Sequence, residues 1–124
     1  MLKQVFWIDS SKFVTDVVSA TLREENITCY THGSADNFHF ILEDMRPEVL
    51  VVDASTLGEN TQVFFKTLES GVESSKIPVV LLGNEEELQT LSKKYKSQIK
   101  GIIKKPLAPM ALTNELKKIL GLTN

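Results

Sequence analysis

Short runs of consecutive apolar residues alternate along the whole chain with segments in which apolar residues recur every three or four positions. A run that is apolar throughout indicates a strand covered on both faces, whereas the longer period indicates a helix with one buried stripe. The alternation predicts a doubly wound α/β domain, in which helices cover both faces of a five-stranded parallel sheet. The expected strands occupy residues 5–8, 27–32, 49–52, 79–82 and 101–103.

Five helices are expected, one after each strand. In the first helix, Phe13 opens a stripe of apolar residues that should face the sheet. Ser34 is the expected N-cap of the second helix, and Pro47 marks its end. The third helix follows a loop and should turn Val63 inward. Each of these helices thereby offers one apolar face to the sheet.

The last two helices carry end signals in the sequence. Asn84 and Glu87 have the spacing of a capping box, in which each side chain bonds to the other residue's backbone N–H. Pro109 is favoured in the first turn of the final helix, and Gly121 is expected to stop it. These signals fix where both helices begin and where the last one ends.

Composition narrows the class of protein. The length of 124 residues suits one domain, and 42% hydrophobic with 24% charged residues is typical of a globular chain. A net charge of -2 gives no field that favours nucleic acid or a membrane surface. Cys29 is the only cysteine, so no intrachain disulfide forms, and the apolar runs fall far short of the ~20 residues of a membrane span. We expect a cytoplasmic protein.

Polar and charged residues follow directly after four of the expected strands. In doubly wound sheets, ligands bind at the carboxyl ends of the strands, near the point where the strand order reverses. Two carboxylates and a lysine at one such edge suit phosphoryl chemistry, because a carboxylate can accept a phosphoryl group while cations stabilise its oxygens. The strand ends are Asp9-Ser10, Asp53-Ala54-Ser55, Gly83-Asn84 and Lys104-Lys105-Pro106.

The residues at these strand ends, and their spacing, resemble the signature of bacterial response-regulator receiver domains (CheY-like) over essentially the whole chain. The resemblance implies one receiver domain over residues 1–124, with the flavodoxin-like architecture and the strand order 2-1-3-4-5. It implies that Asp53 is the phosphoacceptor and that Lys105 contacts the phosphoryl group. It also implies that Pro106 follows a cis peptide bond.

The resemblance further implies a magnesium site, with Asp9, Asp53 and the backbone carbonyl of Ser55 as ligands. Ser10 stands where the family has a second acidic residue that binds the metal. Because Mg²⁺ loses its water reluctantly and needs anionic oxygens to do so, we expect it to bind weakly or not at all. Replacement of Ser10 by Asp should improve its binding.

Two further departures concern the switch of the family. Gly83 stands in place of a Thr or Ser whose hydroxyl binds the phosphoryl group, and Ile102 in place of an aromatic residue that changes rotamer. An isoleucine has no polar tip, so we expect its side chain to favour burial. Lys105 and the backbone N–H of Asn84 remain to contact a phosphate. The sequence therefore predicts an atypical receiver, or pseudo-receiver, whose surface responds little to modification.

The implied function is two-component (phosphorelay) signal transduction by protein–protein interaction. Such a chain is a signalling and binding module, a phosphoacceptor at most, and not an enzyme. Its expected partners are a histidine kinase or phosphotransfer protein and a downstream protein, which would dock on residues 85–120. Nucleic acid and membrane are not expected partners of this domain. The chain would be either a stand-alone receiver or a piece of a longer regulator.

Several features have simpler explanations. Asp53 and Asp9 could be ordinary loop or capping residues. The Ser10-Ser11 turn could bind a phosphate of FMN, which makes a flavodoxin-like carrier the alternative function, or it could simply cap the first helix. A cluster of basic residues is either a solvated face or a docking surface for a partner. The cluster consists of Lys93, Lys94, Lys96, Lys100, Lys104 and Lys105.

Overall fold

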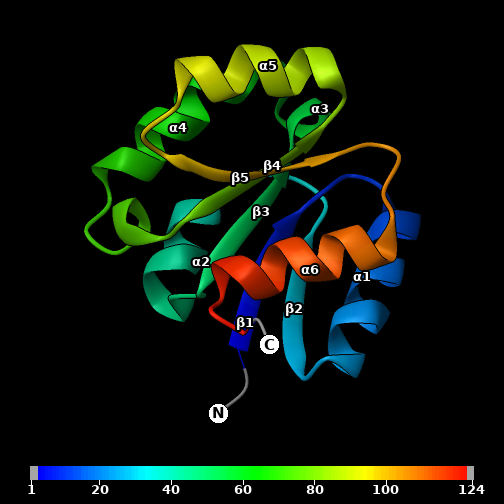
Figure 1. Cartoon of the computed structure of the whole chain (residues 1–124). Coiled ribbons are helices and arrows are strands. Elements are labelled where there is room, and N and C mark those ends of the chain that lie inside the picture. The colour runs from blue at the N-terminus through cyan, green and yellow to red at the C-terminus, as the bar shows by residue number, and fades with distance from the viewer. Residues whose placement is uncertain (1–2, 123–124) are drawn as a thin grey trace.

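The computed structural model describes residues 3–122, which form one parallel sheet flanked by helices (Figure 1). The five strands pair in the order β2-β1-β3-β4-β5, as the sequence predicted. In chain order they are β1 (Lys3–Ile8), β2 (Ile27–His32), β3 (Val49–Asp53), β4 (Val79–Gly83) and β5 (Ile99–Lys104).

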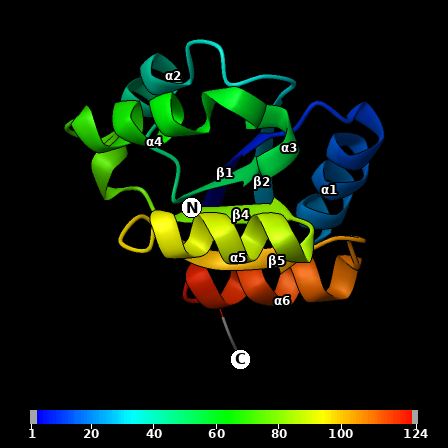
Figure 2. The same cartoon turned by 90° about the horizontal axis from the view of Figure 1, so that it is seen from above.

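Helices cover both faces of the sheet (Figures 1 and 2). α1 (Lys12–Glu24) and α6 (Pro109–Ile119) pack on one face. The other face carries α2 (Phe38–Met45), a short α3 (Ala54–Leu57), α4 (Thr61–Ser70) and α5 (Glu85–Lys94). The five expected helices are thus α1, α2, α4, α5 and α6. The short α3 and the 3-10 turn η1 (Gly58–Asn60) lie in the expected loop after β3. A second 3-10 turn, η2 (Ser74–Lys76), precedes β4. No helix within residues 3–122 combines the length and apolarity that a bilayer crossing requires.

The core has two layers, one on each side of the sheet. Alternate residues of a strand point to opposite faces, so Phe6 packs with the α2 to α5 layer and Trp7 with the α1 and α6 layer. Strands β1, β3 and β4 have no exposed residue, which explains their continuous apolar runs. The central strands are therefore held rigidly, and the residues that follow them are positioned by the core.

Two residues expected to face inward lie in solvent instead. Phe13 is 79% exposed and Val63 is also exposed. In α1 the buried stripe runs through Thr15, Val18 and Leu22, so its centre lies on a different side of the helix from Phe13. Thr15 can be buried because its hydroxyl donates to the carbonyl of Lys12.

The expected cap of α2 was also wrong. The Ser34 hydroxyl accepts from the Asp36 backbone N–H and closes a local turn. The helix begins only after Asn37, which takes the N-cap position in a left-handed conformation without a side-chain cap. A serine hydroxyl can accept a backbone N–H either in a turn or at a helix start, and the Ser34 hydroxyl does so in the turn.

The other end signals are confirmed. Asn84 and Glu87 form the complete capping box of α5, and Pro109 is in the first turn of α6. Gly121 follows α6 with a φ of 73°, a conformation that glycine adopts without strain. Ser11 caps α1 by accepting from the Val14 N–H.

The packing of α6 predicts that two truncations on this helix lower the free energy of unfolding by different amounts. Leu116→Ala should lower the free energy of unfolding by about 2–5 kcal/mol, because Leu116 is fully buried against the sheet. Met110→Ala is the matched control and should change it by less than about 0.5 kcal/mol, since Met110 is exposed. Urea denaturation measures the free energy of unfolding of both variants, and an equal loss in the two would contradict the placement of α6.

Candidate functional site at the carboxyl edge of the sheet

The carboxylate of Asp53 lies at the end of the central strand β3 and is only 2% exposed. Lys105 follows β5, two strands away, and its Nζ atom lies 2.6 Å from Asp53 Oδ1. The chain thus brings together two residues that are far apart in sequence. An isolated buried carboxylate would be very costly, so this ion pair is the main compensation for the charge.

The second carboxylate oxygen of Asp53 accepts two hydroxyl hydrogen bonds. Ser55 Oγ donates to Asp53 Oδ2 at 2.6 Å, and Thr56 Oγ1 donates to the same atom at 2.8 Å. Burial raises the pKa of Asp53, but the bonds from Lys105, Ser55 and Thr56 outweigh burial and hold the pKa below its usual value. Asp53 is therefore an ionised carboxylate whose Oδ2 accepts two hydrogen bonds, while the buried Oδ1 accepts none and depends on the charge of Lys105 alone.

Asp9, directly after β1, is buried as well, and both of its oxygens accept from protein donors. The Ser11 backbone N–H bonds to Oδ1 at 2.9 Å, and the Trp7 indole N–H bonds to Oδ2 at 3.3 Å. Burial raises the pKa of Asp9 and the charge of Asp53 adds to this, while the bonds from Ser11 and Trp7 and the charge of Lys105 offset it only in part. Asp9 thus shares the site without contacting a cation.

Thr56 joins the two loops that carry these carboxylates. Its hydroxyl oxygen accepts from the Ser10 backbone N–H at 2.9 Å and lies 3.3 Å from the Ser10 hydroxyl. Neither Thr56 nor the side chains of Ser55 and Trp7 were expected from the sequence to be part of the site. The signal it offered was the run of two hydroxyl residues directly after Asp53 and Ala54.

The two switch positions, Gly83 and Ile102, lie on β4 and β5. A side chain at Gly83 would meet Glu87 Oε1 at 3.1 Å, so the Glu87 side chain fills the space beside this glycine. The backbone N–H of Asn84, expected to be available to a phosphate, instead donates to Glu87 Oε1 at 2.9 Å. Ile102, expected to favour burial, is 49% exposed because its side chain leaves the sheet at an edge strand. The peptide bond before Pro106 is cis, as expected.

These residues do not fit a bound magnesium ion in this arrangement. The part of the chain in residues 3–122 contains no group of three acidic, His or Cys side chains placed to hold a metal. Three of the four oxygens of Asp9 and Asp53 accept a hydrogen bond, and the fourth, Asp53 Oδ1, is paired with the Lys105 ammonium without a hydrogen bond. Mg²⁺ demands near-octahedral oxygen ligands at ~2.0–2.1 Å, so it would have to displace these donors. The weak site formed with the Ser55 carbonyl stays a prediction.

The Ser10-Ser11 turn offers little to the phosphate of a flavin. The Ser11 hydroxyl caps α1, and the backbone N–H groups of Ser10 and Ser11 are taken by Thr56 and Asp9. Anion binding at a helix start depends on N–H groups that point at the ligand. The simpler explanation of this turn, capping of the helix, agrees with these contacts.

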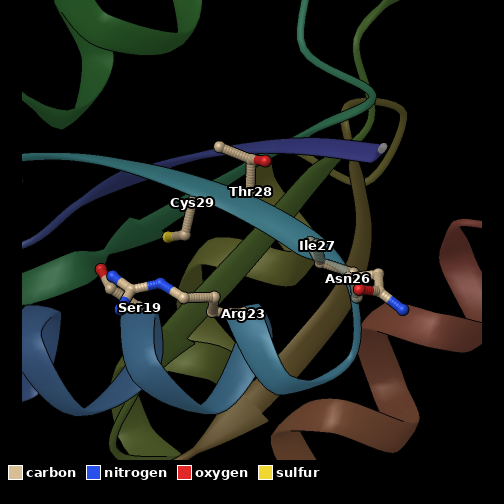
Figure 3. Close-up of a pocket in the computed structure, with 6 residues that line it drawn as sticks. All are labelled: Ser19, Arg23, Asn26, Ile27, Thr28 and Cys29. Carbon is tan, nitrogen blue, oxygen red and sulfur yellow. The ribbon is translucent and has the colours of Figure 1, made fainter. Parts of the chain in front are cut away.

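A separate pocket of about 190 Å³ lies between α1 and β2, next to Cys29 (Figure 3). Ser19 and Arg23 line it from α1, and the Arg23 side chain extends toward Ser19 (Figure 3). Burial raises the pKa of the Cys29 thiol to about 12, against a smaller opposing effect from Ser19. The thiol therefore stays protonated at neutral pH, in line with the expected structural role of Cys29.

Comparison with known proteins defines the fold. No protein-family model matches the chain, and no curated protein does. The chemotaxis response regulator CheY4 of Vibrio cholerae matches with a TM-score of 0.83 at 18% identity, over 96% of this chain and 99% of that one. A response regulator from Desulfuromonas acetoxidans matches with 0.83 at 16% identity, over 98% and 99%. The chain has the fold of response-regulator receiver domains, as the sequence predicted.

A third solved structure is described with a metal. It is the receiver domain of the sensor histidine kinase PA1611 from Pseudomonas aeruginosa, with a magnesium ion coordinated in the active site cleft. It matches with a TM-score of 0.81 at 11% identity, over 98% of this chain and 99% of that one. The fold therefore holds a magnesium ion in that protein.

The ion pair predicts a non-additive pair of substitutions. Lys105→Met should lower the free energy of unfolding by about 1–3 kcal/mol, because it leaves the buried Asp53 charge without its cation; the cost is reduced because Lys105 is partly exposed. In an Asp53→Asn background the same change should cost much less, since no charge remains to be paired. Urea denaturation of the four proteins measures the coupling, and equal costs in both backgrounds would refute it.

Proposed function

We propose that this chain is a receiver module of two-component signalling that works mainly by binding a protein partner. The observation that carries the proposal is the Lys105–Asp53 ion pair of 2.6 Å at the carboxyl edge of a sheet with the receiver fold. Asp53 is the candidate phosphoacceptor, because it is an ionised carboxylate with a cation in place beside it. A histidine kinase or a phosphotransfer protein is the expected donor.

The expected docking region, residues 85–120, contains an open groove between α5 and β5. This α5–β5 groove measures about 430 Å³. The half-exposed side chain of Ile102 lies in it and also lines a neighbouring hollow of about 240 Å³ beside Glu85 and Lys104. The lining residues of the groove are Ser92, Lys93, Lys96, Ile99, Lys100, Gly101 and Ile102.

The chemistry of this groove defines the partner. An exposed isoleucine can anchor an apolar side chain, and the surrounding lysines favour a partner with acidic residues around that anchor. Charges at the rim mainly raise the rate of association and make it depend on salt. We therefore propose a downstream protein that presents an apolar residue within an acidic surface.

The switch positions support binding that is largely constitutive. A phosphate at Asp53 would find no hydroxyl at position 83, and the Asn84 N–H is already bonded to Glu87. Ile102 is already half-exposed without any modification. A ligand shifts an equilibrium only through different interactions with the two states, and little of that difference is available here.

Partner binding is tested with the histidine kinases, phosphotransfer proteins and response effectors of the source organism, each immobilised in turn. Ile102→Glu should weaken binding of the true partner by about tenfold or more, because it places an anion at the apolar anchor of the groove. Phe40→Glu is the matched control, since Phe40 is an exposed apolar residue on α2 and lies outside the groove. Binding should also weaken with added salt. Equal effects of the two substitutions would contradict docking at the groove.

Constitutive binding is tested separately by amide spectroscopy. Backbone amide shifts are recorded with and without a beryllofluoride phosphate mimic in excess magnesium. We expect any change to stay confined to the surroundings of Asp53, because Gly83 and the engaged Asn84 amide transmit little to α5. Large shifts that spread through α5 and β5 would instead show a switch driven by phosphorylation.

A further inference from the structure

A single oxygen atom, Thr56 Oγ1, ties together the loops that follow β1 and β3. It lies 2.8 Å from Asp53 Oδ2 and 2.9 Å from the backbone nitrogen of Ser10. The hydroxyl of Ser10 is 3.3 Å away. Residues 10 and 56 come from different strand ends, so this contact closes the edge of the sheet between Asp53 and the start of α1.

The protons of this contact can be assigned. A threonine hydroxyl has one hydrogen to donate and two lone pairs that accept. The Ser10 N–H can only donate, and the ionised Asp53 carboxylate can only accept. The Thr56 hydrogen therefore points to Asp53, and its lone pairs face Ser10, whose own hydroxyl can supply a second donor.

This contact joins Ser10 to Asp53, which is one of the expected magnesium ligands. Asp53 Oδ2 is already bonded by Ser55 and Thr56, and Oδ1 is paired with Lys105. A magnesium ion cannot approach Asp53 Oδ2 at ligand distance unless a hydroxyl such as that of Thr56 leaves, and at Oδ1, which accepts no hydrogen bond, it would have to compete with the Lys105 ammonium. Ser10, unlike a carboxylate, adds no negative charge to attract the ion.

We propose that Thr56 is a positioning residue whose hydroxyl bridges Ser10 and Asp53 in place of a cation and holds Asp53 against Lys105. This inference rests on the proposed role of Asp53 as the acceptor and extends it, because the acceptor site is then closed without metal. Thr56 acts through its contacts with Asp53 and Ser10 and needs no contact with a phosphate.

Tryptophan fluorescence provides a direct test. Trp7 is the only tryptophan of the chain, is fully buried, and donates its indole N–H to Asp9 beside the site. Magnesium chloride is titrated into the full chain, with sodium chloride at equal ionic strength as the blank. The unmodified protein should show no saturable change in emission in the millimolar range.

Thr56→Ala removes the bridge and leaves room for a hydrated ion. It should give a saturable response to Mg²⁺, with an affinity at least roughly tenfold above that of the unmodified protein. Thr56→Ser restores the hydroxyl and should abolish the response again. Thr61→Ala is the matched control: the Thr61 hydroxyl bonds to the Gly58 carbonyl and makes no contact with Asp53. Circular dichroism checks that each variant is folded.

The proposal is overturned if the unmodified protein binds Mg²⁺ as tightly as Thr56→Ala, or if Thr56→Ala remains without response while folded. A response of Thr56→Ser equal to that of Thr56→Ala would overturn it as well, because the hydroxyl would then not matter. The titration uses no partner protein. Failure of partner binding at the α5–β5 groove would therefore contradict the proposed function and leave the role of Thr56 standing.

Discussion

The buried carboxylate of Asp53 is the constraint around which the carboxyl edge of the sheet is arranged. A charge with 2% exposure loses most of its hydration, and the loss must be compensated by groups that the fold brings to it. The ammonium of Lys105 supplies the opposite charge, and Ser55 and Thr56 supply hydroxyl donors. These groups come from two different strand ends, so the charge is compensated only when β3, β4 and β5 are aligned.

The same arrangement connects the site to the proposed docking surface. Lys105 directly follows β5, and β5 also carries Ile102 in the α5–β5 groove. The Asn84 N–H at the start of α5 is held by Glu87 rather than left for a phosphate. β5 is thus tied to the site by the Lys105–Asp53 ion pair, and the start of α5 is fixed by its own capping box. The largely constitutive partner binding that we propose depends on this arrangement.

The architecture could be predicted from the sequence, because continuous apolar runs indicate the strands of the sheet and capping residues indicate most helix ends. It also located Asp9, Asp53 and Lys105, since parallel strands place their carboxyl ends at one edge. It could not show the role of Thr56 or the engagement of the Asn84 amide, because a hydrogen bond depends on side-chain directions set by packing. The orientation of Phe13 was missed for a related reason: the buried stripe of α1 is centred on Thr15, a polar residue.

The central claim is that protein groups, and not a metal ion, surround Asp53. The most direct measurement is a crystal structure of the protein grown in Mn²⁺, a cation with similar oxygen preference that gives an anomalous signal. The account predicts no anomalous peak within coordination distance of Asp53, and a Thr56 hydroxyl still in hydrogen-bond contact with both Ser10 and Asp53. A strong peak between Asp9 and Asp53, with the Thr56 side chain turned away, would contradict the account.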